Sequence, residues 1–139
     1  MSTATPSATL HEIETILVVE DEVLVRMVIS DYLRDCGYRV IEAANADEAL
    51  VVLEQHDLSV DAVLSDVEMP GAMDGFALAR WIRQHRPGLD VVLVGSPDRA
   101  AAAAADLCEA GPALAKPYEP HAVVDRIRRL LAERRSRRP

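Results

Sequence analysis

Short apolar runs alternate with amphipathic segments along most of the chain. The runs are rich in β-branched residues, and their apolar continuity is typical of strands buried on both faces. They lie at Thr15–Val19, Arg39–Ile41, Val60–Leu64, Val91–Val94 and, more weakly, Ala113–Ala115. Because helical patterns separate them, these runs predict a parallel sheet with helices on both faces.

Between the runs, apolar residues recur every three or four positions, which predicts helices with one buried face. The clearest series is Val25, Val28, Ile29, Tyr32 and Cys36. Similar patterns predict helices over 46–53, over 76–82, from 97 through an alanine run, and from about 119 onwards. Asp74 and Ser96 stand where helix-capping residues are expected, and Pro97 suits the first helical position.

Five successive strand–helix units indicate an α/β fold. We expect a (βα)5 flavodoxin-like, doubly wound five-stranded parallel sheet with strand order 2-1-3-4-5. A chain of 139 residues has room for one domain. We place a disordered lead at 1–12, the domain at 13–133 and an Arg-rich tail at 134–139.

The amino-acid composition argues against some classes of function. Twenty-three acidic against fifteen basic residues give a net charge of −8, which argues against bulk nucleic-acid binding. The sequence has no secretory signal and no apolar stretch long enough to span a membrane, so a cytoplasmic protein is expected. Cys36 and Cys108 are therefore expected to be reduced thiols that pack on helices, and not to form a disulfide.

Acidic residues follow two of the predicted strands. Glu20 and Asp21 come after the first strand, and Asp66 and Glu68 come at the end of the third. Ligands of such sheets bind beyond the carboxyl ends of the strands, so Glu20, Asp21 and Asp66 are expected in one cleft. Two carboxylates about 4 Å apart repel by roughly 4 kcal/mol at an effective dielectric near 20, and oxygen-only ligands suit Mg²⁺. Lys116 follows the fifth strand and brings a cation to the same edge.

Three sequence motifs, in this order along the chain, are typical of one protein family. They are ILVVEDE at 16–22, LSDVEMPGAMDG at 64–75 and LAKPY at 114–118. From about Ile13 to Leu131 the chain resembles the CheY-like receiver domain of bacterial two-component response regulators. The resemblance implies that Asp66 accepts a phosphoryl group from a histidine kinase and that Lys116 contacts that group.

The same resemblance implies a ligand set for Mg²⁺. Asp21 and Asp66 would bind the ion directly, Glu20 mostly through water, and Glu68 through its main-chain carbonyl. In the family a Ser or Thr ends the fourth strand and an aromatic residue stands in the fifth. Here Gly95 and Ala113 occupy those positions. Ser96 is either a substitute hydroxyl for the phosphoryl group or simply the helix cap.

The sequence thus predicts a single-domain response regulator that is no enzyme beyond its own phosphorylation and dephosphorylation. Its expected partners are a histidine kinase, hybrid kinase or phosphotransfer protein and a downstream protein, with no membrane or nucleic acid; a homodimer is left open. Because of Gly95 and Ala113, the alternative is a degenerate receiver that binds partners independently of phosphorylation. A receiver cut from a longer hybrid kinase also fits the sequence.

Overall fold

The computed structural model describes residues 13–55, 57–110, 122, 125–126, 128–130 and 132–133. Its elements are β1 (Thr15–Val19), α2 (Val23–Asp35), β2 (Arg39–Ala43), α3 (Ala46–Leu53), β3 (Ala62–Asp66), α4 (Gly75–His85), β4 (Asp90–Val94) and α5 (Pro97–Ala110). The predicted alternation of strands and helices is confirmed over this part of the chain. None of the helices in the described ranges is long and apolar enough to cross a bilayer.

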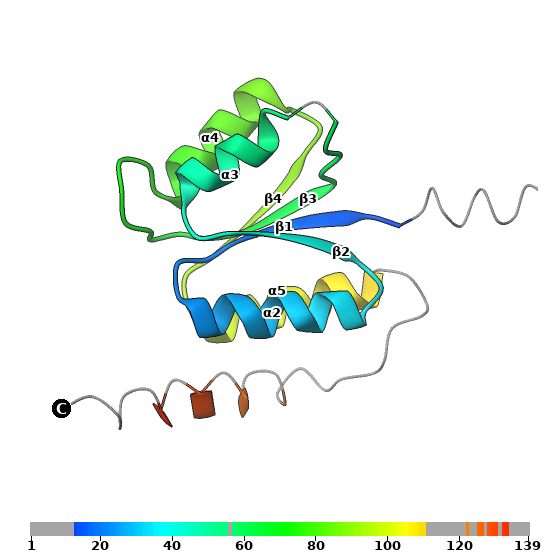
Figure 1. The fold of residues 1–139 in the computed structure, drawn as a ribbon, viewed down its shortest axis with the longest axis vertical. Coiled ribbons are helices and arrows are strands. Elements are labelled where there is room, and N and C mark those ends of the chain that lie inside the picture. Colours follow the sequence, from blue (N-terminus) through cyan, green and yellow to red (C-terminus); the bar gives the residue numbers. More distant parts are fainter. Residues whose placement is uncertain are drawn as a thin grey trace, which may run out of the picture.

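The described strands form one parallel sheet in the order β2-β1-β3-β4. Helices α2 and α5 lie side by side on one face, and α3 and α4 cover the other (Figure 1). This is the doubly wound flavodoxin-like architecture predicted from the sequence. The predicted fifth strand at 113–115, the lead at 1–12 and the tail at 134–139 lie outside the described residues, and the domain limits stay a prediction.

The central strand β1 separates two apolar cores. Ile16 and Val18 pack against the layer of α2 and α5, whereas Leu17 and Val19 pack against the layer of α3 and α4. All four side chains are at most 2% exposed. Neither face of such a strand meets water, which explains the continuous apolar run from Ile16 to Val19.

The third strand is confirmed, but β3 at Ala62–Asp66 lies two residues further along the chain than the predicted Val60–Leu64. Pairing with β1 begins only at Ala62, opposite Ile16. Just before it, the N–H of Asp61 donates to the carbonyl of Thr15 (2.9 Å), and the carboxylate of Asp61 accepts a hydrogen bond from the N–H of Thr15 (2.8 Å). At its other end β3 extends to Asp66, which pairs with Val94 of β4, so this carboxylate stands on the last residue of the strand.

The expectation of two reduced cysteines is also wrong for this structure. Cys36 follows α2, Cys108 lies near the end of α5, and the two form a disulfide with their Cα atoms 5.4 Å apart. The residues are 72 positions apart in sequence, and only the side-by-side packing of the two helices brings them together. The absence of a secretory signal bears on the compartment of the protein and not on the distance between its two cysteines.

Candidate functional site

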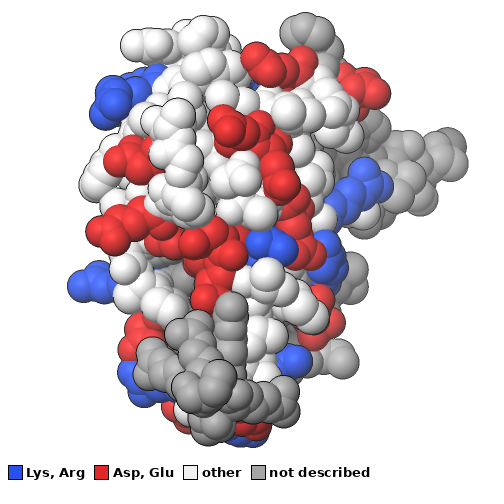
Figure 2. All heavy atoms as spheres, turned by 60° about the vertical axis from the view of Figure 1, so that its left-hand side comes forward, with Lys and Arg blue, Asp and Glu red and all other residues white. Residues whose placement is uncertain are grey.

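The carboxyl ends of β1 and β3 bring three acidic side chains together. The two strands are paired in parallel up to Val19 and Ser65, so the residues that follow, Glu20 and Asp66, are neighbours at one edge. One carboxylate oxygen each of Glu20, Asp21 and Asp66 lies within 4.8 Å of the others. Figure 2 shows acidic side chains gathered across the face that contains this edge. The cluster predicted from the strand ends is therefore present.

Hydrogen bonds from its backbone and its carboxyl group hold Glu20 in place. Its N–H donates to the carbonyl of Ala43 (3.0 Å), and its own carbonyl accepts from Nη1 of Arg26 (2.8 Å). Its carboxylate accepts a hydrogen bond from the N–H of Glu22 (3.0 Å). Only 8% of the residue is exposed, so the carboxyl group has little freedom and little water around it.

Burial and mutual repulsion change the acidity of the cluster. Burial, followed by the negative charges of Asp66 and Asp21, raises the pKa of Glu20 to about 8. Burial and then the charge of Asp21 raise the pKa of Asp66, whereas its hydrogen bond with Glu20 lowers it. Without a cation, Glu20 therefore holds the proton that the cluster needs at neutral pH, and Asp66 is the acceptor of the bond between them.

These residues fit a divalent cation. The cluster offers only oxygen ligands, and a buried carboxyl group whose pKa is raised by its neighbours is stabilised when a positive charge replaces its proton. Few protein ligands together with an exposed Asp21 suit Mg²⁺, which keeps several waters. Glu68 is exposed just beyond β3, and its main-chain carbonyl as a ligand stays a prediction. Lys116 lies outside the described residues.

Gly75 is a site residue that the sequence analysis missed. It opens α4, and its N–H donates to the carbonyl of Val67 (2.8 Å). A Cβ at this position would lie 2.1 Å from the carbonyl oxygen of Asp66 and 2.9 Å from the Cα of Val67. Only glycine allows α4 to pack this closely on the strand end that carries Asp66. The Asp-Gly pair that opens the helix was the signal in the sequence.

The caps predicted for α4 and α5 are confirmed. The carboxylate of Asp74 accepts from the N–H of Ala77 (2.9 Å), and Oγ of Ser96 accepts from the N–H of Arg99 (3.1 Å). The Ser96 hydroxyl thus acts as a cap and keeps its own hydrogen for another acceptor. Its contact with a phosphoryl group stays a prediction, and Ala113 lies outside the described residues.

Gly95 follows directly on Val94, the partner of Asp66 in β4. An added Cβ at Gly95 would meet nothing within 4 Å. The position is therefore close to the acidic cluster, lacks a hydroxyl and has room for a side chain.

We predict that Gly75→Ala disturbs the site through the backbone. The added methyl group overlaps the carbonyl of Asp66, so we expect the free energy of unfolding to fall by about 1–3 kcal/mol or more, with weaker Mg²⁺ binding. Chemical denaturation and calorimetric titration measure the two effects. Gly88→Ala is the matched control, because a Cβ there meets nothing within 4 Å. Equal behaviour of the two variants would contradict the role of Gly75.

Binding of Mg²⁺ is predicted to strengthen as the pH rises from 6 to 8. The pKa of Glu20 is raised from 4.5 to about 8, so the folded chain binds this proton more tightly than the unfolded chain does. That contribution to stability is complete below pH 4.5 and is lost as the pH rises through about 8. Mg²⁺ must displace the proton at pH 6 but not above pH 8, so the affinity gains up to about tenfold per pH unit.

Isothermal titration with MgCl₂ at several pH values measures this dependence. Glu20→Gln removes the titrating group, so its affinity should be lower and nearly constant over the same range. A wild-type affinity that does not change with pH would show that Glu20 is not the proton holder.

Comparison with known proteins identifies the family to which the chain is similar. The family model described as the response regulator receiver domain matches residues 16–128. The response regulator protein FleR from Pseudomonas aeruginosa is 39% identical over 121 residues, which cover 82% of this chain and 24% of FleR. The chain therefore spans about a quarter of the length of this relative.

Solved structures give the same result. The response regulator protein TrrA from Thermotoga maritima, in complex with Mg²⁺-BeF, is 26% identical with a TM-score of 0.55, over 85% of this chain and 99% of that one. A complex of the histidine kinase ThkA with TrrA gives 32% identity and a TM-score of 0.54, over 60% of this chain and 70% of that one. With a family model that matches most of its length, the chain belongs to the response regulator receiver domains.

Proposed function

We propose that this chain receives a phosphoryl group on Asp66 in a Mg²⁺-dependent reaction of a two-component system. The observation that carries the proposal is the meeting of Glu20, Asp21 and Asp66 at the ends of β1 and β3 in a chain of this family. The TrrA structure supports it, because that receiver is bound to Mg²⁺ and BeF, and beryllofluoride stands in for a phosphoryl group.

The chemistry follows from the arrangement of the carboxylates. A carboxylate oxygen of Asp66 forms a bond to phosphorus while the bond from phosphorus to the donor breaks, and the donor leaves with that electron pair. The attack needs the ionised form of Asp66, whose pKa is raised by burial and by the charge of Asp21 and lowered by its hydrogen bond with Glu20. When bound, Mg²⁺ supplies positive charge to the phosphoryl oxygens, and Lys116 is proposed to pair with them as well.

The proposed donor is a histidine kinase, a hybrid kinase or a phosphotransfer protein. Support comes from the ThkA–TrrA complex, in which a related receiver is bound to a histidine kinase. We propose a cytoplasmic location and an output through contact with a downstream protein. The chain catalyses no reaction other than its own phosphorylation and dephosphorylation in this proposal. The single-domain form stays a prediction.

A second candidate function is a receiver that binds its partner whether or not Asp66 is phosphorylated. The observation that favours it lies beside Asp66, where Gly95 offers no hydroxyl. The hydroxyl of the next residue after Gly95, Ser96, already caps α5. A phosphoryl group would then add about −1.5 to −2 charges without a hydroxyl at position 95 to respond to it.

The first function predicts that Asp66 is the site of modification. Incubation with acetyl phosphate and Mg²⁺ should add one phosphoryl group to the wild type and none to Asp66→Ala, as measured by intact mass. Glu68→Gln is the matched control, since it removes a nearby exposed carboxylate and leaves the backbone intact. Equal mass gain in Asp66→Ala, or no gain in the wild type, would rule out the proposal.

The second function predicts a weak response of α5 to a phosphoryl mimic. With beryllofluoride and Mg²⁺, hydrogen exchange of residues 97–110 should change little in the wild type and clearly in Gly95→Thr. The threonine fits the free space at Gly95 and restores a hydroxyl. Gly95→Val has nearly the same shape without the hydroxyl and should behave like the wild type. A wild-type response as large as that of Gly95→Thr would exclude the second function.

A further inference from the structure

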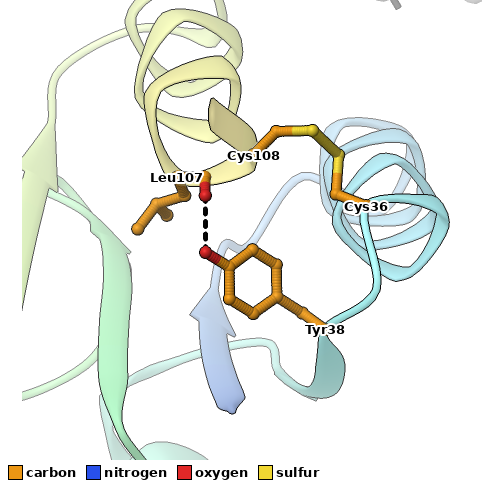
Figure 3. Close-up of a disulfide and its surroundings, with 4 residues drawn as sticks. All are labelled: Cys36, Tyr38, Leu107 and Cys108. Carbon is orange, nitrogen blue, oxygen red and sulfur yellow. Dashed lines mark hydrogen bonds between the residues drawn. A yellow bond between two sulfur atoms is a disulfide. The ribbon is translucent and has the colours of Figure 1, made fainter. Parts of the chain in front are cut away.

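The disulfide ties together the ends of two helices on one face of the sheet. Cys36 caps the carboxyl end of α2, and Cys108 lies near the carboxyl end of α5. Next to this bond, the hydroxyl of Tyr38 donates to the carbonyl of Leu107 (Figure 3). The carboxyl end of α5 is therefore held to the segment after α2 by one covalent bond and one hydrogen bond.

Within the described residues, the apolar packing of α5 relies mainly on small side chains. Where burial is described along α5, the buried side chains are alanines, at positions 100, 101, 104 and 105, and the partly buried Ala103, Leu107 and Cys108 pack against the same core. A methyl group buries far less apolar surface than a Leu or Ile side chain, so each contact stabilises the helix only slightly. At the surface, Asp98 and Arg128 form an ion pair, but exposed pairs of this kind contribute little. The disulfide therefore adds a covalent tie to a contact between α5 and α2 that otherwise rests on modest apolar packing.

We propose that Cys36 and Cys108 form a reversible thiol–disulfide site that reacts with dithiols and sets how firmly α5 is held against α2. Cys108 is half-buried, whereas Cys36 is 0% exposed, so the sulfur of Cys108 is the one open to attack. A thiolate of the dithiol bonds to this sulfur, and Cys36 leaves as a thiolate that takes up a proton.

The second thiolate of the dithiol then attacks its own partner sulfur and releases Cys108. The protein gains two electrons and two protons, and the dithiol becomes a disulfide. Oxidation by a disulfide reagent runs the same exchange backwards. In the cytoplasmic location proposed above, disulfides are rare and commonly transient or redox-sensing, which favours a reversible bond over a permanent one.

The surroundings of the two sulfurs suit the reduced state as well. Cys36 belongs to an apolar cluster with Tyr32 and Leu33, and Cys108 packs against the same cluster. A free thiol behaves as a small apolar side chain in such a setting. Reduction therefore removes the covalent tie and leaves the core in place, as a switch requires.

The site can act on the receiver through α5. This helix begins just after Gly95 and Ser96, next to the strand residue paired with Asp66, and its far end carries Cys108. The disulfide thus restrains one end of a helix whose other end borders the acidic cluster. One further expectation rests on the proposed function of Asp66: the lifetime of the phosphoryl group differs between the two redox states.

The experiment compares the full chain after equilibration with oxidised or reduced dithiothreitol. Alkylation after acid quenching and unfolding in denaturant should label no cysteine in the oxidised protein and both in the reduced protein, as read from intact mass. Hydrogen exchange over residues 97–110 should be about tenfold faster after reduction, and the Tm should fall by about 10 °C. Because this comparison needs no substitution, it does not depend on how a variant folds.

Cys108→Ala is the matched variant, and the same dithiothreitol treatments should leave its exchange rates and Tm unchanged. Tyr38→Phe removes only the neighbouring hydrogen bond and should keep the redox response. Free thiols in the oxidised wild type, a disulfide to a second copy, or equal exchange of α5 in both states would overturn the proposal. If acetyl phosphate fails to modify Asp66, the function fails, whereas the alkylation and exchange results still decide the redox site.

Discussion

Parallel pairing of β1 with β3 is the interaction on which the rest of the molecule depends. Both strands are apolar on both faces, so they are stable only between two helical layers, and that requirement fixes the doubly wound arrangement. The same pairing places Glu20 and Asp66 next to each other at one sheet edge although they are 46 residues apart in sequence. The acidic cluster is thus a consequence of the way the core is buried. The pairing of these strands keeps the carboxyl groups close together despite the electrostatic repulsion between them.

The site shows what such a position costs in stability. Glu20 is buried beside two further carboxyl groups, and its pKa rises to about 8 because the charged form is poorly solvated there. An ordinary core position would hold an apolar residue at this depth. Gly75 adds a second constraint, since the close approach of α4 to Asp66 leaves no space for a side chain. Stability and site geometry therefore compete at the same few residues.

Much of the fold and the cluster could be predicted from the sequence, because both depend on patterns that repeat along the chain. The alternation of apolar runs and helical periodicity gave the architecture, and the acidic residues after two runs gave Glu20, Asp21 and Asp66. The start of β3 could not be predicted, since the carboxylate of Asp61 bonds to Thr15 across 46 residues. Cys36 and Cys108 were misjudged for the same reason: their proximity arises from the packing of α2 on α5, which no local pattern records.

The disulfide has a topological consequence for assembly of the site. In the oxidised chain, residues 36–108 form a closed covalent ring, which contains β2, β3 and β4 and therefore Asp66. Strand β1, which leads into Glu20 and Asp21, lies outside the ring, yet it pairs with β2 on one side and with β3 on the other. An oxidised chain that refolds must insert its central strand between two strands of a ring that is already closed. In the reduced chain the same strands can pair in any order.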